Sequence, residues 1–199
     1  MYQYLSIYLC WVLWCFVTFF MSKQGKRNTY SIVLLLFLIL LPYEIIIIDL
    51  PMNGSFLFLL AYSVFATIQS NLTFKKYFSI LLMSYLYAIY FIWRITSPIL
   101  NDFSFITIAV ISGFLLLQIS SKNLHQQITI LIAGVSFGQF LYSIICRSYY
   151  LQYTINDTHF FSILFSILLL MAIQHSWEYL IIKIENVVKM VEFRKRWNS

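Results

Sequence analysis

Long uninterrupted apolar segments are the feature of this sequence that most limits its fold. The first, YLSIYLCWVLWCFVTFFM at residues 4–21, holds no charged side chain. Such a run is typical of a transmembrane helix, because about 20 residues rising 1.5 Å each cross a hydrocarbon core of about 30 Å. Similar runs fill the 199 residues, of which 10% are charged, against about 25% in soluble domains. The sequence therefore predicts one polytopic membrane domain and no separate soluble domain.

The predicted fold class is all-α, a polytopic transmembrane helical bundle. The apolar runs are continuous, whereas the strands of a membrane barrel alternate apolar and polar residues. A bundle at 1–182 precedes a basic amphipathic tail at 183–199. Six spans is the alternative to seven, because the third run is the shortest and glycines interrupt the sixth. The seven predicted spans are 4–21, 30–49, 55–70, 77–95, 103–119, 128–146 and 160–182.

The distribution of basic residues supports seven spans and gives an orientation, because cytoplasmic loops are rich in Lys and Arg. The first, third and fifth loops between the predicted spans lie on one side of the membrane with the tail. Together they hold 11 of the 13 basic residues. The other loops hold only Arg94 and Arg147, beside Asp49, Asp102 and Asp157. We therefore predict an external N-terminus and a cytoplasmic C-terminus. The 11 residues are Lys23, Lys26, Arg27, Lys75, Lys76, Lys122, Lys183, Lys189, Arg194, Lys195 and Arg196.

Net charge and cysteine content argue against a nucleic-acid partner, a metal site and a cofactor. The net charge of +6 is spread between spans, which fits membrane topology and argues against a nucleic-acid-binding patch. Cys10, Cys15 and Cys146 form neither a disulfide framework nor a metal-binding pattern. We expect them to be buried free thiols, with Cys10 and Cys15 about 140° apart around one helix.

The opening YLSIYLCWVLWCFVTFFMSKQGKR is an aromatic first span closed by a basic loop. Together with the chain length and the seven-span layout, it resembles the YphA-like small membrane proteins of Bacillus-type bacteria. This resemblance implies a multi-pass protein of the bacterial cytoplasmic membrane and brings no catalytic residues with it. The heavy use of Ile, Phe, Tyr, Lys and Asn also suits an AT-rich bacterial genome.

The segment LLPYEIIIIDLP places an acidic residue inside the second predicted span. On a helix, Glu44 would lie roughly 7–8 Å below the outer surface, five residues before Asp49. A carboxylate at that depth needs a partner, a wet crevice or a proton. Arg94 and Arg147 are the cations on that side, and Pro42 can bend the helix nearby. We predict an outer cluster of Glu44 with Arg94, Arg147 or both, which forms either an ion pair that fixes packing or a ligand or proton site. A lone protonated glutamate is the remaining alternative.

The sequence QHSWEYL marks a second cluster at the inner end of the last span. His175 and Glu178 are three residues apart and share a helix face, and Gln69 and Gln118 end their own spans nearby. We expect a hydrogen-bonded polar girdle, with a proton relay or ligand contact as the alternative. The absence of HExxH and the dispersed positions of the three histidines argue against a zinc protease.

The segment GVSFG matches the nucleophile pattern G-x-S-x-G, but that pattern acts on a strand-to-helix elbow. Within a membrane helix, Gly134 and Gly138 instead predict a small-residue face for close helix packing. Ser136 and His175 lie at similar depths, so a Ser–His dyad is the catalytic alternative.

The tail combines an apolar face with intrahelical ion pairs. Val187, Val188 and Val191 form the face, and Glu185 and Lys189 illustrate the i,i+4 pairing. We interpret it as an extension of the last helix held at anionic lipid headgroups, with a docking or dimerisation helix as the alternative.

Three functional hypotheses follow. The first is a non-enzymatic membrane interaction or accessory protein that binds another membrane protein or the lipid bilayer. The second is a small permease or channel that uses the outer and inner polar clusters. The third is an intramembrane hydrolase that uses Ser136 and His175. No internal repeat supports the second hypothesis.

Overall fold

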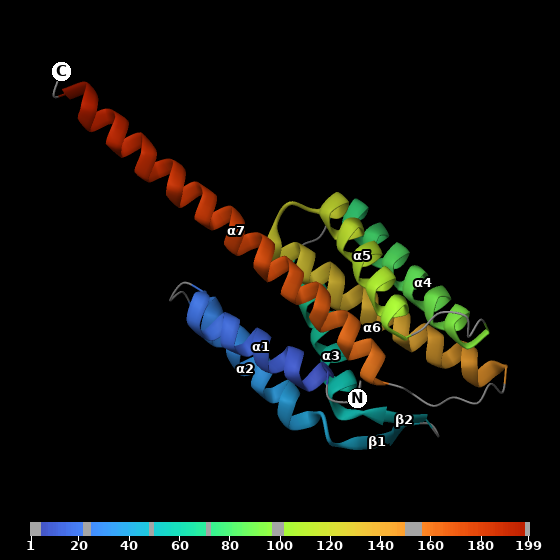
Figure 1. Cartoon of the computed structure of the whole chain (residues 1–199). Helices are drawn as coiled ribbons and strands as arrows, with labels where there is room; N and C mark the ends of the chain where they lie inside the picture. The colour runs from blue at the N-terminus through green and yellow to red at the C-terminus, as the bar shows by residue number, and fades with distance from the viewer. Residues whose placement is uncertain are drawn as a thin grey trace.

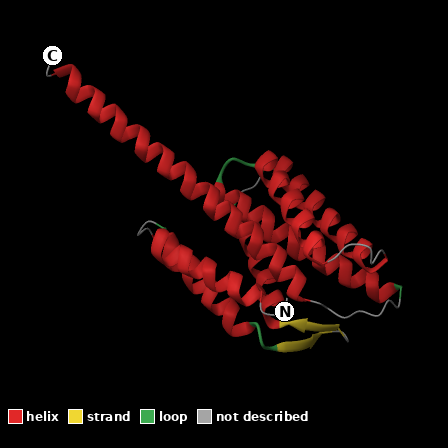
Figure 2. Cartoon of the chain, viewed as in Figure 1, coloured by secondary structure: helices red, strands yellow, loops and turns green. Residues whose placement is uncertain are grey.

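The computed structural model describes residues 5–21, 25–47, 50–70, 73–96, 102–149 and 157–197. These residues contain seven helices and one two-stranded antiparallel sheet (Figures 1 and 2). The elements are α1 (Leu5–Phe20), α2 (Gly25–Leu40), β1 (Glu44–Ile47), β2 (Leu50–Asn53), α3 (Gly54–Gln69), α4 (Phe74–Thr96), α5 (Asp102–Ser120), α6 (Leu124–Ser148) and α7 (Asp157–Trp197).

Helix α6 lies at the centre of the bundle. It packs most extensively against α4 and also contacts α3, α5 and α7, while α1 packs against α2 and α7. Every side chain of α6 from Thr129 to Ser136 is buried, so neighbouring helices surround this part of it. The core between the helices is rich in aromatic rings, among them Tyr87, Phe161 and Phe165.

Two glycines let α4 and α6 approach closely. A Cβ atom at Gly134 would lie 2.8 Å from Cβ of Met83, and one at Gly138 would lie 2.8 Å from the backbone oxygen of Ser84. Distances this short leave no room for a side chain. The helix runs unbroken from Leu124 to Ser148, so the expectation that glycines interrupt this span was wrong. Packing against α4 compensates the low helix propensity of glycine, which is about 1 kcal/mol poorer than alanine.

The second predicted span, 30–49, was wrong over its second half. Helix α2 ends at Leu40, and a turn at Leu41 and Pro42 leads into the hairpin of β1 and β2. Proline cannot donate an intrahelical hydrogen bond, and it disfavours the helical conformation of the residue before it. The isoleucines that follow are β-branched and suit an extended strand. Glu44 consequently pairs with Asn53 across the hairpin and does not lie on a transmembrane helix.

Asn53 joins the hairpin to α3. Its side chain accepts a hydrogen bond from the backbone N–H of Ser55 (2.9 Å), which caps the helix N-terminus, and donates one to the Leu41 carbonyl (2.6 Å). The N–H of Gly54 donates to the carbonyl of Tyr43 at 2.7 Å. These bonds tie the end of α2 to the start of α3 and hold the hairpin at that end of the bundle.

Three helical segments are long and apolar enough to cross a membrane: Phe74–Thr96, Leu124–Ser148 and His159–Asn186. Four shorter segments are also apolar, and 16 residues of helix rise about 24 Å, somewhat less than the hydrocarbon core. The shorter segments are Ser6–Phe20, Arg27–Leu40, Gly54–Gln69 and Phe105–Ser120. The all-helical, apolar character predicted for the bundle is confirmed, while seven crossings and the orientation stay predictions.

Helix α7 is the longest element, with 41 residues and a length of about 60 Å. It continues through the predicted boundary at residue 182 without a break. Figure 1 shows its C-terminal part extending well beyond the other helices.

The cysteines differ in exposure. Cys10 and Cys146 are buried free thiols as expected, but Cys15 is exposed, so its predicted burial was wrong. The side of α1 that carries Cys10 packs into the bundle, and Cys15 lies on another side of the same helix.

Candidate functional site

Arg94, in the last turn of α4, is the centre of a polar cluster at the end of the bundle predicted to be external. Its Nη2 atom lies 2.7 Å from Nε2 of His159, a buried residue in the first turn of α7. Its guanidinium carbon lies 5.4 Å from the ring centroid of Phe105 in the first turn of α5, a cation–π distance. The cluster therefore links α4, α5 and α7.

The chemistry of arginine sets the direction of this hydrogen bond. Arginine carries only hydrogen-bond donors, so Nη2 of Arg94 donates and Nε2 of His159 accepts. Tyr90 supports the same arrangement, because its ring stacks on Phe105 at 4.2 Å and its hydroxyl donates to the Phe105 carbonyl at 2.8 Å. The result is a cation held between an imidazole and an aromatic ring.

The structure only partly places the outer cluster predicted from sequence. Arg94 has His159 as a partner, a residue that sequence analysis did not select. Arg147 is exposed at the end of α6. The backbone of Glu44 lies in β1, and its side chain and Asp49 are outside the described residues. One sequence feature could have identified His159 as a partner of Arg94. It stands immediately before the last apolar run, at the same predicted membrane surface as Arg94.

The inner cluster forms around two glutamines. Gln118 of α5 and Gln174 of α7 exchange amide hydrogen bonds, and Gln174 also donates to Oε1 of Glu178 at 3.0 Å. Glu178 thus belongs to the polar girdle, which joins α5 to α7. His175 is exposed and has no hydrogen bond to Glu178 in the described part of the chain.

The middle of α6 carries two buried polar groups. Ser136 is fully buried and Gln139 is 4% exposed, yet Oγ of Ser136 and Oε1 of Gln139 have no hydrogen-bond partner among the described residues. Ser136 therefore forms no dyad with His175 in this structure. The two groups lie three residues apart, on the side of the helix away from Gly134 and Gly138.

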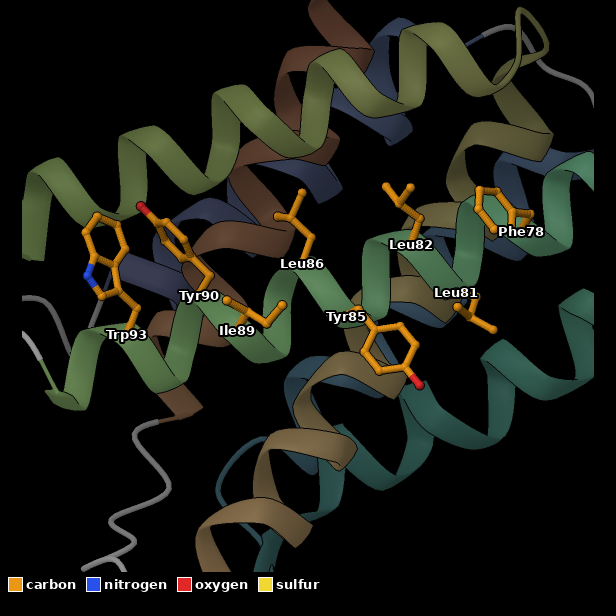
Figure 3. Close-up of a pocket in the computed structure, with 8 residues that line it drawn as sticks. All are labelled: Phe78, Leu81, Leu82, Tyr85, Leu86, Ile89, Tyr90 and Trp93. Atoms are coloured by element: carbon orange, nitrogen blue, oxygen red, sulfur yellow. The ribbon is translucent and has the colours of Figure 1, made fainter.

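Helix α4 presents an exposed apolar face with a shallow hollow, shown in Figure 3. Tyr85 lies at the centre of the helix, is 54% exposed and makes no hydrogen bond through its hydroxyl within the described residues. Figure 3 shows Tyr85 and Leu81 directed away from α5, whereas Leu82 and Leu86 point toward it. The residues that line the hollow are Phe78, Leu81, Leu82, Tyr85, Leu86, Ile89, Tyr90 and Trp93.

Sequence analysis did not select this face. The available signal was a tyrosine eleven residues from both ends of the apolar segment Phe74–Thr96, with apolar residues three and four positions away. In the described part of the chain, no group of three or more His, Cys, Asp or Glu side chains is placed to hold a metal ion.

Apolar helices, an aromatic core and polar groups confined mainly to the two ends define a helical integral membrane protein. The family model described as YphA-like integral membrane protein matches residues 2–197. The chain belongs to this family, which confirms the resemblance seen in its sequence. No curated protein and no solved structure matches the chain significantly.

Proposed function

We propose that the chain is a non-enzymatic accessory protein of the bacterial cytoplasmic membrane that binds another integral membrane protein. The binding surface is the exposed face of α4 around Tyr85. The observation that carries the proposal is the position of the Tyr85 hydroxyl, at mid-length of a helix long enough to span the membrane.

A hydroxyl in hydrocarbon is unfavourable unless it has a hydrogen-bond partner. Tyr85 lies about 16 Å along the helix from both Phe74 and Thr96, so in a transmembrane α4 its hydroxyl is near the bilayer midplane. Transfer of a hydroxyl from water to a medium without hydrogen bonds costs roughly 4–8 kcal/mol. Lipid tails offer it no acceptor, whereas a backbone carbonyl or polar side chain on a neighbouring helix does. The surrounding aromatic and aliphatic side chains provide the apolar contact for such a helix.

In-cell photocrosslinking tests the surface directly. A benzophenone side chain at Leu81, one turn from Tyr85 on the same face, should give one discrete adduct with a membrane protein. The same group at Ile111, an exposed apolar position in the middle of α5, serves as the matched control and should crosslink to lipid. Lipid adducts at both positions would contradict the proposal.

Tyr85→Phe isolates the hydroxyl. Interhelical hydrogen bonds in membranes contribute about 0.6–1.7 kcal/mol, so the variant should bind its partner about 3- to 20-fold more weakly. Tyr77→Phe is the control on the same helix, because Tyr77 is exposed near the end of α4, where headgroups and water can satisfy its hydroxyl. Equal co-purification of the partner with both variants would remove Tyr85 from the interface.

A permease is the second candidate, and the buried groups of α6 favour it. Oγ of Ser136 and Oε1 of Gln139 have no hydrogen-bond partner among the described residues, so they are suited to contact water or a small polar solute inside the bundle. A Ser136→Cys variant without the native cysteines should then react with a small hydrophilic thiol reagent in membranes. Ile130→Cys, also fully buried but on another side of α6, is the control. Inert cysteines at both positions would argue against a wet path.

A further inference from the structure

Exposed apolar residues form a straight stripe along α7. Leu170, Ile173, Trp177, Leu180 and Ile184 are all exposed and are spaced alternately by three and four residues. Val187 and Val191 continue the spacing by their positions on the helix, which extends to Trp197. The stripe covers three heptads. Apolar residues repeated every 3.5 positions are the pattern of a coiled-coil seam.

In the C-terminal part of this stripe, Trp177, Leu180 and Ile184 are 65%, 49% and 62% exposed. Gln174 bonds to Gln118, two residues before α5 ends at Ser120, so α7 leaves the side of α5 soon afterwards. All side chains from Trp177 to Asn186 are exposed. Figure 1 shows this part of α7 standing apart from the other helices. Beyond the apolar segment that ends at Asn186, the helix continues to Trp197, and a short helical extension in water is stabilised by packing against a partner.

We infer that the partner is a second copy of this chain, joined through a parallel α7–α7 contact. Copies inserted in the same orientation present identical stripes that run in the same direction and meet about a two-fold axis. Ile184 and Val191 at one seam position, with Leu180 at the other, match the preference of parallel two-stranded coiled coils for β-branched residues and leucine. Trp177 and Val187 depart from this preference. This contact is separate from the α4 face and does not depend on the proposed function.

Charge placement also permits this self-association. Lys183 occupies a position beside the seam that opposes Val188 of a second copy, so no like charges face each other there. Glu185 and Lys189 are four residues apart on the outer side of the helix, where they can pair within one chain. The next seam position after Val191 is Arg194. Two like-charged arginines would meet there in the dimer, so the seam ends before this position.

Disulfide crosslinking in native membranes tests this contact. In a full-length chain without the native cysteines, Leu180→Cys and Ile184→Cys should convert most of the protein to a covalent dimer on oxidation. Ile182→Cys is the matched control, because Ile182 is also exposed but lies on the side of the helix away from the seam. Only cysteines whose Cβ atoms approach to about 4 Å form the bridge, so Ile182→Cys should stay monomeric.

A second measurement does not depend on cysteine chemistry. The protein mass of the full chain in mild detergent should be twice that of the 23.7 kDa protomer, as expected for a dimer. The Ile184→Glu variant should instead have the mass of one protomer. Since Ile184 lies outside the packed bundle, the helical circular dichroism signal should be retained. Equal dimer yields from Ile182→Cys and Ile184→Cys, crosslinks to a different protein, or a wild-type monomer would each overturn the inference.

Discussion

Replacement of Gly138 by alanine tests the close approach of α4 and α6. The added Cβ would lie 2.8 Å from the backbone oxygen of Ser84 and 3.0 Å from Cβ of Tyr87. Neither atom is the far end of a flexible side chain, so α4 itself must move away. Overpacking of this kind costs about 1–3 kcal/mol, and the higher helix propensity of alanine returns up to about 1 kcal/mol. We expect a net loss of roughly 1–2 kcal/mol, a factor of about 5–30 in the folded-to-unfolded ratio.

Reversible unfolding in mixed micelles, followed by circular dichroism, measures this loss. Ser148→Ala is a suitable control, because Ser148 is exposed at the end of the same helix and its replacement adds no atom to the α4 interface. Gly138→Ala should unfold at a lower denaturant fraction than wild type, and Ser148→Ala should not. A Gly138→Ala variant as stable as wild type would refute the close contact between the two helices.

Two further substitutions probe hydrogen bonds that join separate elements. His159→Ala should destabilise the bundle by about 1–3 kcal/mol, because it removes the acceptor for a partly buried Arg94 donor, and His159→Gln should recover part of the loss in the same unfolding assay. Asn53→Ala should cost about 1–2 kcal/mol through loss of the helix cap on Ser55 N–H and the bond to Leu41. The Asn53→Asp side chain can still accept the hydrogen bond from Ser55 N–H but cannot donate to the Leu41 carbonyl. If this variant is only as stable as Asn53→Ala, the capping role is contradicted.

In the outer cluster, the burial of the Arg94 cation depends on its contacts with neighbouring side chains. The cation of Arg94 is half-buried, and its contacts with His159 and Phe105 replace hydration that the bundle excludes. The same residues connect the starts of α5 and α7 to the end of α4. A cluster that joins three helices in this way stabilises their relative positions whether or not it also binds a ligand.

Local sequence determined most of the helix positions. The apolar runs predicted α1, α3, α4 and α5 to within a few residues at each end, because transfer of each side chain to hydrocarbon contributes almost independently of its neighbours. The end of α2 was also encoded locally, in Pro42 and the isoleucines after it, but the apolar run concealed it. Hydrophobicity alone does not distinguish a buried helix from an apolar strand.

The tertiary structure decided which side chains meet. No local rule brings Arg94 to His159, 65 positions later, or Gln118 to Gln174, because these contacts depend on which helices become neighbours. The same holds for Tyr85, whose exposure follows from α4 packing its opposite side against α6. Span positions result from summed transfer free energies of single residues, whereas pairing results from shape complementarity between helices far apart in the chain. The sequence by itself thus determined a membrane bundle, and only its packing located the polar clusters and the surfaces left for partners.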